Sequence, residues 1–156
     1  MLAQRFIDTG LLVNHYRVLT LFGAVLLAFK TAATVPRAPL DSPDDELAKV
    51  MVKARRRDAP IARELTRDPD VLEMAGRAAL ALPEIPLQGI DIIREAETGK
   101  LFALEANPGG NTWIFSKGEM SDRLIKALNV EHLSRPFDAF TTAAKVLIER
   151  TRAEAQ

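Results

Sequence analysis

The chain of 156 residues contains no cysteine, which excludes disulfide bonds and metal sites built from thiolates. Its two histidines, His15 and His132, lie far apart in the sequence, so the pattern does not indicate a zinc site. No Gly-x-Ser-x-Gly sequence occurs, and covalent catalysis by an activated serine or cysteine is not supported. The lack of cysteine is compatible with a cytoplasmic location.

The chain also lacks an excess of either charge, because 21 basic and 21 acidic residues cancel. Bulk charge therefore predicts binding neither to nucleic acid nor to a membrane surface. The longest near-continuous apolar run, residues 18–29, is too short to span a bilayer. With 47% hydrophobic and 27% charged residues, the composition is that of one globular domain.

Two alternating runs on either side of a turn ending in Gly99 predict a β-hairpin. Counting outward from a three-residue connection places Asp91 directly opposite Glu105 and Gly89 opposite Asn107. Since side chains alternate along a strand, Asp91, Glu105 and Asn107 should share one face.

Two carboxylates facing each other across strands repel by up to about 1 kcal/mol, so a cation is expected between Asp91 and Glu105. Oxygen donors without nearby His or Cys favour Mg²⁺, Ca²⁺ or Mn²⁺. The alternative is a structural salt bridge with Lys or Arg. A register slip of one residue would also separate the pair.

An earlier hairpin is predicted from residues 16–22 and 25–31, closed by Gly23 and Ala24. This register places Arg17 opposite Lys30. Two facing cations indicate a bound anion, unless both side chains turn toward solvent.

Helices are expected at residues 44–57, 70–82, 121–128 and 136–152, with a proline-rich loop at residues 34–45. Asp68 and Pro69 suit the start of the second helix. Lys53 and Arg55, Arg56 and Arg57 form a basic run that could receive phosphate or nucleic acid, although a solvated helix end is the favoured interpretation. The last helix carries an apolar stripe of Phe137, Phe140, Ala144, Leu147 and Ile148.

The sequences GIDII and LFALEANPGG, joined by the turn, resemble the metal-binding hairpin of the ATP-grasp superfamily. This resemblance implies that Asp91, Glu105 and Asn107 hold Mg²⁺ (or Mn²⁺) between the phosphates of ATP. The glycine-rich stretch after Asn107 could bind a phosphate or a substrate carboxylate through backbone N–H groups, with Trp113 and Phe115 anchoring it.

Upstream, AQRFIDTG and HYRVLTLFGAVLLAFK are similar to the superfamily's hinge strand and the strand pair that follows it. The resemblance implies that the backbone of Arg5, Phe6 and Ile7 meets adenine. It also implies that Arg17 and Lys30 contact phosphate and assist catalysis.

The resemblance covers nearly the whole chain but only the second half of an ATP-grasp fold. It implies an α+β fold, an antiparallel β-sheet with flanking helices. The resemblance treats residues 1–156 as one ATP-grasp C-terminal part. This part consists of a hinge strand and β-hairpin (1–33), a loop and helices (34–86), the metal-binding hairpin and Gly-rich loop (87–113) and C-terminal helices (114–156). The chain departs from the family near residues 44–57, where related ligases usually carry an Asn.

The function implied is the ATP- and Mg-binding part of a carboxylate–amine ligase that acts through an acylphosphate. Expected partners are nucleotide, a small carboxylate and an amine, together with either an N-terminal lobe supplied in trans or self-association of the chain. Residues 18–29 are expected to offer the apolar face for that contact. Two alternatives remain open: a non-catalytic remnant that binds metal or nucleotide, and an interaction domain whose hairpin acids pair with Arg17 or Lys30.

Overall fold

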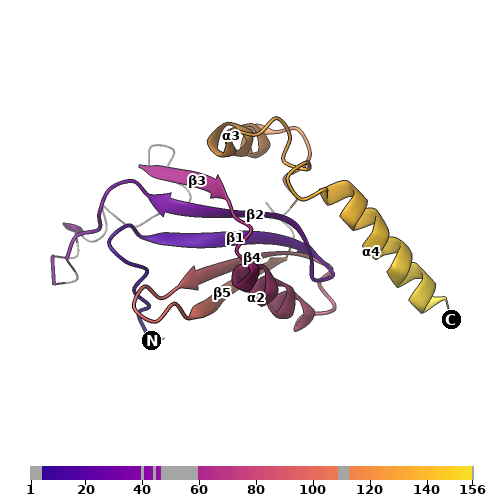
Figure 1. The fold of residues 1–156 in the computed structure, drawn as a ribbon, viewed down its shortest axis with the longest axis horizontal. Coiled ribbons are helices and arrows are strands. Elements are labelled where there is room, and N and C mark those ends of the chain that lie inside the picture. Colours follow the sequence, from indigo (N-terminus) through magenta and orange to yellow (C-terminus); the bar gives the residue numbers. More distant parts are fainter. Residues whose placement is uncertain (1–4, 40, 44, 47–59, 109–112, 156) are drawn as a thin grey trace.

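The computed structural model describes residues 5–39, 41–43, 45–46, 60–108 and 113–155 (Figure 1). Within them the chain forms five β-strands and three principal α-helices. In chain order these are β1 (Asn14–Leu21), β2 (Ala24–Ala33), β3 (Ile61–Leu65), α2 (Pro69–Leu80), β4 (Leu87–Arg94), β5 (Leu101–Pro108), α3 (Glu119–Leu128) and α4 (Ala139–Glu154). No helix in these ranges is long and apolar enough to cross a membrane.

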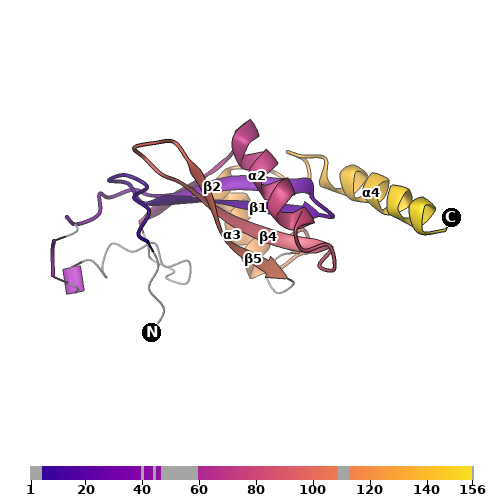
Figure 2. The same cartoon turned by 90° about the horizontal axis from the view of Figure 1, so that it is seen from below.

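The strands form one antiparallel sheet in the order β3-β2-β1-β4-β5. Helix α2 lies over one face of this sheet (Figures 1 and 2). The predicted α+β fold, an antiparallel sheet with flanking helices, is therefore confirmed.

Each face of the sheet has its own core, because apolar side chains alternate between the two faces. On one face, α2 buries Val71, Ala75 and Ala79 against strand residues that include Val18 and Ile90. On the other face, α3 and α4 contribute Leu124, Leu128, Ala139 and Ala143 to a cluster with Leu19, Leu27 and Phe29. The structure thus covers the middle of the sheet on both sides.

Residues 18–29 consequently do not form an uncovered apolar face. Val18, Leu26, Leu27 and Ala28 have no exposed surface, and Phe29 is only 7% exposed. The expectation that this run waits for another lobe was wrong, because the chain's own helices bury it.

The turn between β1 and β2 also differs from the prediction. Phe22 and Gly23 form it, with φ angles of 49° and 83°, and Leu21 pairs with Ala24. A left-handed Phe is uncommon. Here the Phe22 N–H donates to the Pro86 carbonyl at 2.7 Å, which helps to hold the turn in place.

Arg17 therefore pairs with Phe29, and Lys30 pairs with Tyr16. A shift of one residue moves a side chain to the opposite face of a sheet, so Arg17 and Lys30 project to opposite faces. The predicted pairing of these two cations was wrong.

Two further predictions fall partly outside the described residues. Residues 5–10, expected to include the end of a hinge strand, are not in a strand. Residues 45 and 46 are helical, whereas the rest of the helix expected at 44–57, with its basic run, lies outside the described residues. Strand β3, which was not predicted, pairs with β2 at the edge of the sheet.

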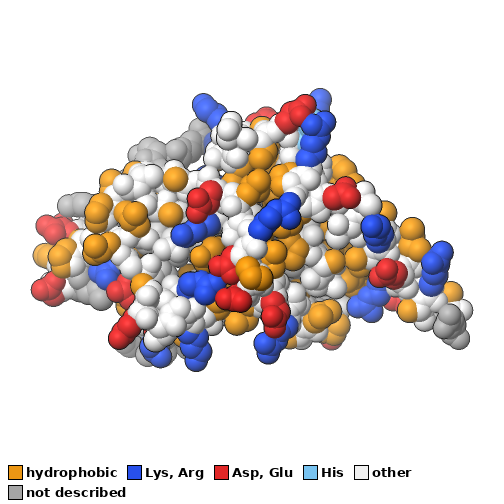
Figure 3. All heavy atoms as spheres, in the orientation of Figure 1, with side chains coloured by type: hydrophobic (Ala, Val, Ile, Leu, Met, Phe, Trp, Pro, Cys, Tyr) orange, Lys and Arg blue, Asp and Glu red, His pale blue; other side chains and the backbone are white. Residues whose placement is uncertain are grey.

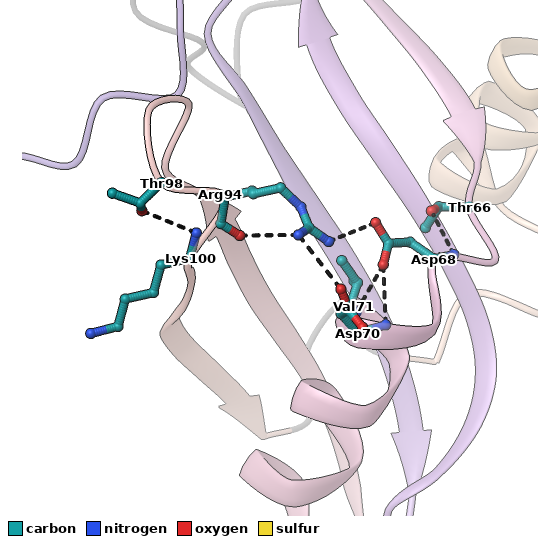
Figure 4. Close-up of polar contacts among 8 residues, drawn as sticks. Thr66, Asp68, Asp70, Val71, Arg94, Thr98 and Lys100 are labelled. Carbon is teal, nitrogen blue, oxygen red and sulfur yellow. Dashed lines mark hydrogen bonds and ion pairs between the residues drawn. The ribbon is translucent and has the colours of Figure 1, made fainter.

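Helix α2 begins as predicted, because the Asp68 carboxylate accepts hydrogen bonds from the N–H groups of Asp70 and Val71, and Pro69 follows it. Figure 4 shows Arg94, from the end of β4, reaching this helix start. Its guanidinium lies 2.7 Å from Asp68 and also donates to the Gly99 carbonyl at 3.0 Å. Burial alone would lower the pKa of Arg94, but hydrogen bonds to Tyr16 and Asp68 raise it. Through its contacts with Asp68 and Gly99, Arg94 links the start of α2 to the β4–β5 turn.

Helix α4 forms where it was expected but turns its apolar stripe outward. Phe140, Leu147 and Ile148 are 55%, 49% and 52% exposed, while Ala139 and Ala143 are buried. The small alanines allow close approach to the core and leave the larger side chains outside. The helix projects past the end of the sheet in both views, and Figure 3 shows hydrophobic side chains along it.

Candidate functional site

The β4–β5 hairpin has the central pairing that the sequence predicted. Asp91 lies opposite Glu105, and Gly89 lies opposite Asn107. Gly99, the predicted last residue of the turn, adopts a left-handed φ of 71°. The face that carries Asp91, Glu105 and Asn107 is the one packed by α3 and α4 further along.

The turn itself is longer than predicted, and a bulge compensates for the difference. The Glu95 N–H donates to the Lys100 carbonyl at 2.9 Å, so Glu95, and not Ala96, faces Lys100. A register shift between Asp91 and Ile92 leaves Leu104 as an extra residue on β5. The pairing of Asp91 with Glu105 is restored by this bulge.

Arg17, on the neighbouring strand β1, lies directly opposite Asp91. Its Nε is 2.5 Å from Asp91 Oδ1, and its Nη2 is 2.7 Å from Asp91 Oδ2. The two side chains are only 27% and 14% exposed. This bidentate geometry is the strong form of an Arg–carboxylate contact. The structural salt bridge considered from the sequence is thus present at Asp91.

Asn107 lies beside this pair, and its Nδ2 donates to Asp91 Oδ2 at 3.2 Å and to the Gly89 carbonyl at 3.4 Å. Glu105 is exposed and forms no ion pair with any residue of the described ranges. Arg17 therefore neutralises Asp91, whereas Glu105 has no counter-ion among the described residues.

Gly89 makes room for the Arg17 side chain. A Cβ atom at Gly89 would lie 2.9 Å from Arg17 Nη1 and 3.5 Å from its Cδ. Any larger residue at this position would push the guanidinium away from its place beside Asp91. This role of Gly89 could not be predicted from the sequence, because the contact comes from another strand.

His15 and Arg63 extend the same face toward β3. His15 pairs with Thr31, and Thr31 pairs with Arg63, so the three side chains form one row across the sheet. Burial lowers the pKa of His15. The nearby Asp91 raises it, and Arg17 and Arg63 lower it further. Sequence reasoning missed Arg63 because strand β3 was not predicted.

The remaining predicted site residues lie elsewhere. Lys30 projects from the opposite face, where its Nζ lies 5.9 Å from the centroid of the Tyr16 ring. Arg5 lies 2.7 Å from Glu95 at the hairpin turn, and Phe6 is 60% exposed. At about 3.3 Å per residue, this end of the hairpin is about 13 Å from Asp91.

The N-terminal segment is held at the turn by its backbone as well. The Ala96 N–H donates to the Asp8 carbonyl at 2.8 Å, and the Asp8 carboxylate lies 2.9 Å from Arg37. The backbone of Arg5, Phe6 and Ile7 is thus beside the hairpin turn and apart from Arg17 and Asp91.

Residues 109–112 of the glycine-rich loop lie outside the described residues. Trp113, which follows them, stacks edge-on against Phe115 with ring centroids 5.1 Å apart, and its Nε1 donates to Ser116 Oγ at 3.0 Å. Phe140 of α4 packs against both rings. These contacts join Trp113 and Phe115 to α4, and their anchoring of the glycine-rich loop stays a prediction.

The donor types of Asp91, Glu105 and Asn107 suit Mg²⁺ or Mn²⁺, but both Asp91 oxygens are engaged by Arg17. In the part of the chain that the structure describes, no three His, Cys, Asp or Glu side chains gather as a metal site. The candidate ligand set consists of two carboxylates and one amide.

Comparison with solved structures finds similarity to complexes of the ATP-grasp ligase PsnB. The complex with minimal precursor is 22% identical with a TM-score of 0.47, covering 83% of this chain and 34% of that chain. The complex with a phosphomimetic precursor variant, Mg and ADP is 18% identical with a TM-score of 0.46, covering 83% and 33%. The complex with precursor peptide PsnA2 and AMPPNP is 17% identical with a TM-score of 0.42, and the match covers 85% of this chain and 32% of that chain.

The chain thus spans about a third of the length of these structures. No family model matches it, and no curated protein matches it significantly. Because these identities and TM-scores are low, the residues and their geometry must carry any functional argument.

Proposed function

We propose that this chain is the ATP- and Mg-binding part of an ATP-grasp carboxylate–amine ligase that acts through an acylphosphate. The observation that carries the proposal is the shared face of Asp91, Glu105 and Asn107, with Arg17 in contact with Asp91. Oxygen ligands of this kind are those that Mg²⁺ binds together with substrate phosphates.

In this proposal Asp91, Glu105 and Asn107 hold the metal ion. When bound, magnesium neutralises charge on a phosphoryl group that is transferred to a carboxylate. Arg17 contacts phosphate from the next strand, and the backbone of residues 5–7 meets adenine at the far end of the hairpin. Lys30 has no part in this arrangement, because it projects from the opposite face.

We propose that the complete reaction also requires a lobe that closes over the nucleotide and lies outside residues 1–156. Catalysis of this type rests on positioning and electrostatics, so the chain alone should not ligate a carboxylate to an amine. Cytoplasmic location, nucleotide as a partner and the use of Mg²⁺ or Mn²⁺ belong to the same proposal.

A second function is favoured by one specific observation. The bidentate contact of Arg17 neutralises Asp91 without any metal. This is the arrangement expected of an interaction domain, or of a non-catalytic remnant, in which the hairpin acids have a structural role.

Titration of the protein with Mn²⁺ alone separates these functions. Replacing a charged ligand, in Glu105→Gln or Asp91→Asn, should weaken Mn²⁺ binding about tenfold or more. Glu64→Gln is the matched control, because Glu64 is an exposed carboxylate paired with Lys30 on the opposite face. Equal affinities in all of these proteins would place the metal elsewhere and favour the structural role.

The stability of the metal-free variants gives a second readout. Asp91→Asn should destabilise the fold, because it leaves the half-buried Arg17 without its carboxylate. Glu105→Gln should be neutral or slightly stabilising, because it removes the like charge opposite Asp91. A urea titration should therefore show a loss of stability for Asp91→Asn and no loss for Glu105→Gln.

A further inference from the structure

The feature that leads beyond the proposed function is that protein donors engage both carboxylate oxygens of Asp91. Arg17 Nε and Nη2 contact one carboxylate oxygen each, at 2.5 and 2.7 Å, and Asn107 Nδ2 shares the second oxygen at 3.2 Å. Gly89 leaves the space in which the Arg17 guanidinium lies. The guanidinium therefore stands where a cation bound to Asp91 would stand.

A divalent ion at Asp91 would compete with the bidentate guanidinium, for two reasons. The lone pairs that face the guanidinium are already in use by two N–H groups. The ion and the guanidinium would also be like charges a few ångströms apart in a half-buried site, where repulsion is stronger than in water.

We propose that Arg17 is an internal counter-ion that competes with the metal for Asp91, and that metal entry releases Arg17 to bind the phosphate of the nucleotide. This inference rests on the proposed function and adds a regulatory step to it. In the metal-free protein, the contact of Arg17 with Asp91 joins strand β1 to strand β4. While this contact is present, Arg17 does not bind the phosphate of the nucleotide.

The face that carries Arg17 also carries His15 and Arg63. Arg17 is flanked on its own strand face by His15, and burial lowers the pKa of this imidazole so that it is neutral near pH 7. The neutral His15 does not repel Arg17, and Arg63 lies further along the same row. A phosphate that arrives with the metal therefore meets a freed guanidinium on a face that carries a second one.

The consequence is positive coupling between metal and triphosphate. Each ligand alone must break the contact of Arg17 with Asp91, whereas the second ligand to arrive finds it already broken. Removing Arg17 should therefore have opposite effects on the two ligands: metal alone binds more tightly, and triphosphate binds more weakly.

The test is isothermal titration of wild type, Arg17→Gln and Arg63→Gln with Mn²⁺ alone, followed by tripolyphosphate with and without Mn²⁺. Loss of two charge-assisted hydrogen bonds corresponds to about a tenfold or larger gain in Mn²⁺ affinity for Arg17→Gln. Arg63→Gln removes the same charge from the same face without touching Asp91, so its Mn²⁺ affinity should change much less. The coupling between Mn²⁺ and tripolyphosphate should be present in wild type and lost in Arg17→Gln.

A measurement on the wild-type protein keeps the test independent of how Arg17→Gln folds. The Arg17 Nε–H signal in an NMR spectrum should be protected from solvent exchange in the metal-free state. On addition of Mg²⁺ it should shift and lose that protection, while the Arg94 Nε–H signal stays unchanged.

The outcomes separate this inference from the proposed function. Equal Mn²⁺ affinity for wild type and Arg17→Gln, with an unchanged Arg17 signal, would overturn the competition and leave the metal site standing. No Mn²⁺ binding by either protein would overturn both. Tighter binding by Arg17→Gln, or loss of Arg17 protection with Mg²⁺, supports the competition.

Discussion

Substitution of Gly89 by Ala tests the placement of Arg17 without removing its charge. The added Cβ would lie 2.9 Å from Arg17 Nη1, which is closer than two such atoms can approach. Because Nη1 is at the end of a flexible side chain, the guanidinium should move and leave the backbone in place. Gly89→Ala should thus separate Arg17 from Asp91 while both residues remain.

The expected change in stability is small because two effects oppose each other. Losing the contact of Arg17 with Asp91 costs about 1 kcal/mol once partial exposure of the pair is considered. Replacing a glycine inside a strand by alanine contributes about 0.5–1 kcal/mol of stability. The free energy of unfolding should therefore change by less than about 1 kcal/mol in a urea titration.

The affinity for Mn²⁺ should change more than the stability does. With the guanidinium displaced, Asp91 is open to metal, and Gly89→Ala should bind Mn²⁺ several-fold more tightly than wild type. Gly118→Ala is the control, because a Cβ there meets no atom within 4 Å. Unchanged Mn²⁺ affinity together with a loss of several kcal/mol of stability would refute the reasoning, because it would mean that the backbone had moved and not Arg17.

Three further predictions concern other parts of the chain. Gln88 is buried, and its Nε2 donates to the carbonyls of Ala79, Leu82 and Ile85. Gln88→Leu should therefore lower the free energy of unfolding, measured in a urea titration, by about 2–4 kcal/mol. An unchanged free energy of unfolding would contradict the stabilising role of these hydrogen bonds. Burial lowers the pKa of His15, so protons favour the unfolded chain and stability should fall as the pH drops below about 6.5, by at most about 1.4 kcal/mol per pH unit. That slope should be absent in His15→Gln when unfolding is followed at several pH values. The outward apolar stripe of α4 should drive self-association. In light scattering, the wild-type protein should therefore exceed the monomer mass, and the double variant Leu147→Glu, Ile148→Glu should not. Equal masses for the two proteins would exclude this surface as the site of self-association.

The pairing of Asp91 with Glu105 could be predicted because it depends on alternation and on a local turn. The prediction assumed a regular ladder and a short connection, whereas the hairpin has a longer turn and a bulge at Leu104. These two departures cancel at Asp91. The alternation of side chains therefore predicted that Asp91 and Glu105 share a face, but it did not predict the length of the turn or the bulge at Leu104.

The register of β1 with β2 could not be predicted in the same way. It depends on a left-handed Phe22, which is held by a hydrogen bond to Pro86 and by the Arg150 guanidinium 4.7 Å from its ring. Both contacts come from distant parts of the chain. The local sequence alone predicted a turn one residue later, at Gly23 and Ala24, and this register wrongly paired Arg17 with Lys30.

Strand β3 and the orientation of α4 were missed for a related reason. Strand β3 has only 5 residues, and its alternation of half-buried and exposed residues is too short to predict a strand by itself. The segment is a strand because it pairs with β2. In α4 the hydrophobic stripe was the strongest local signal. The helix instead packs through Ala139 and Ala143, because small residues allow closer approach to the core.

The role of Arg17 shows the limit of sequence reasoning at the site itself. The sequence indicated that a cation should neutralise the hairpin carboxylates, and it left open whether this is a metal ion or a side chain. Only the order β1-β4-β5 in the sheet shows that Arg17 is the neighbour of Asp91. The position of a strand in a sheet is set by the whole fold, so the local pattern could not supply it.

The most direct test of the central claim is a thermal melt of the wild-type protein with and without millimolar Mg²⁺ and ATP. A ligand at a hundred times its dissociation constant stabilises the native state by about 2.7 kcal/mol, which is readily seen in a melt. We expect this shift in wild type and a loss of it in Asp91→Asn and Glu105→Gln. An unchanged melting temperature in wild type would contradict the assignment of a magnesium–nucleotide site to this hairpin.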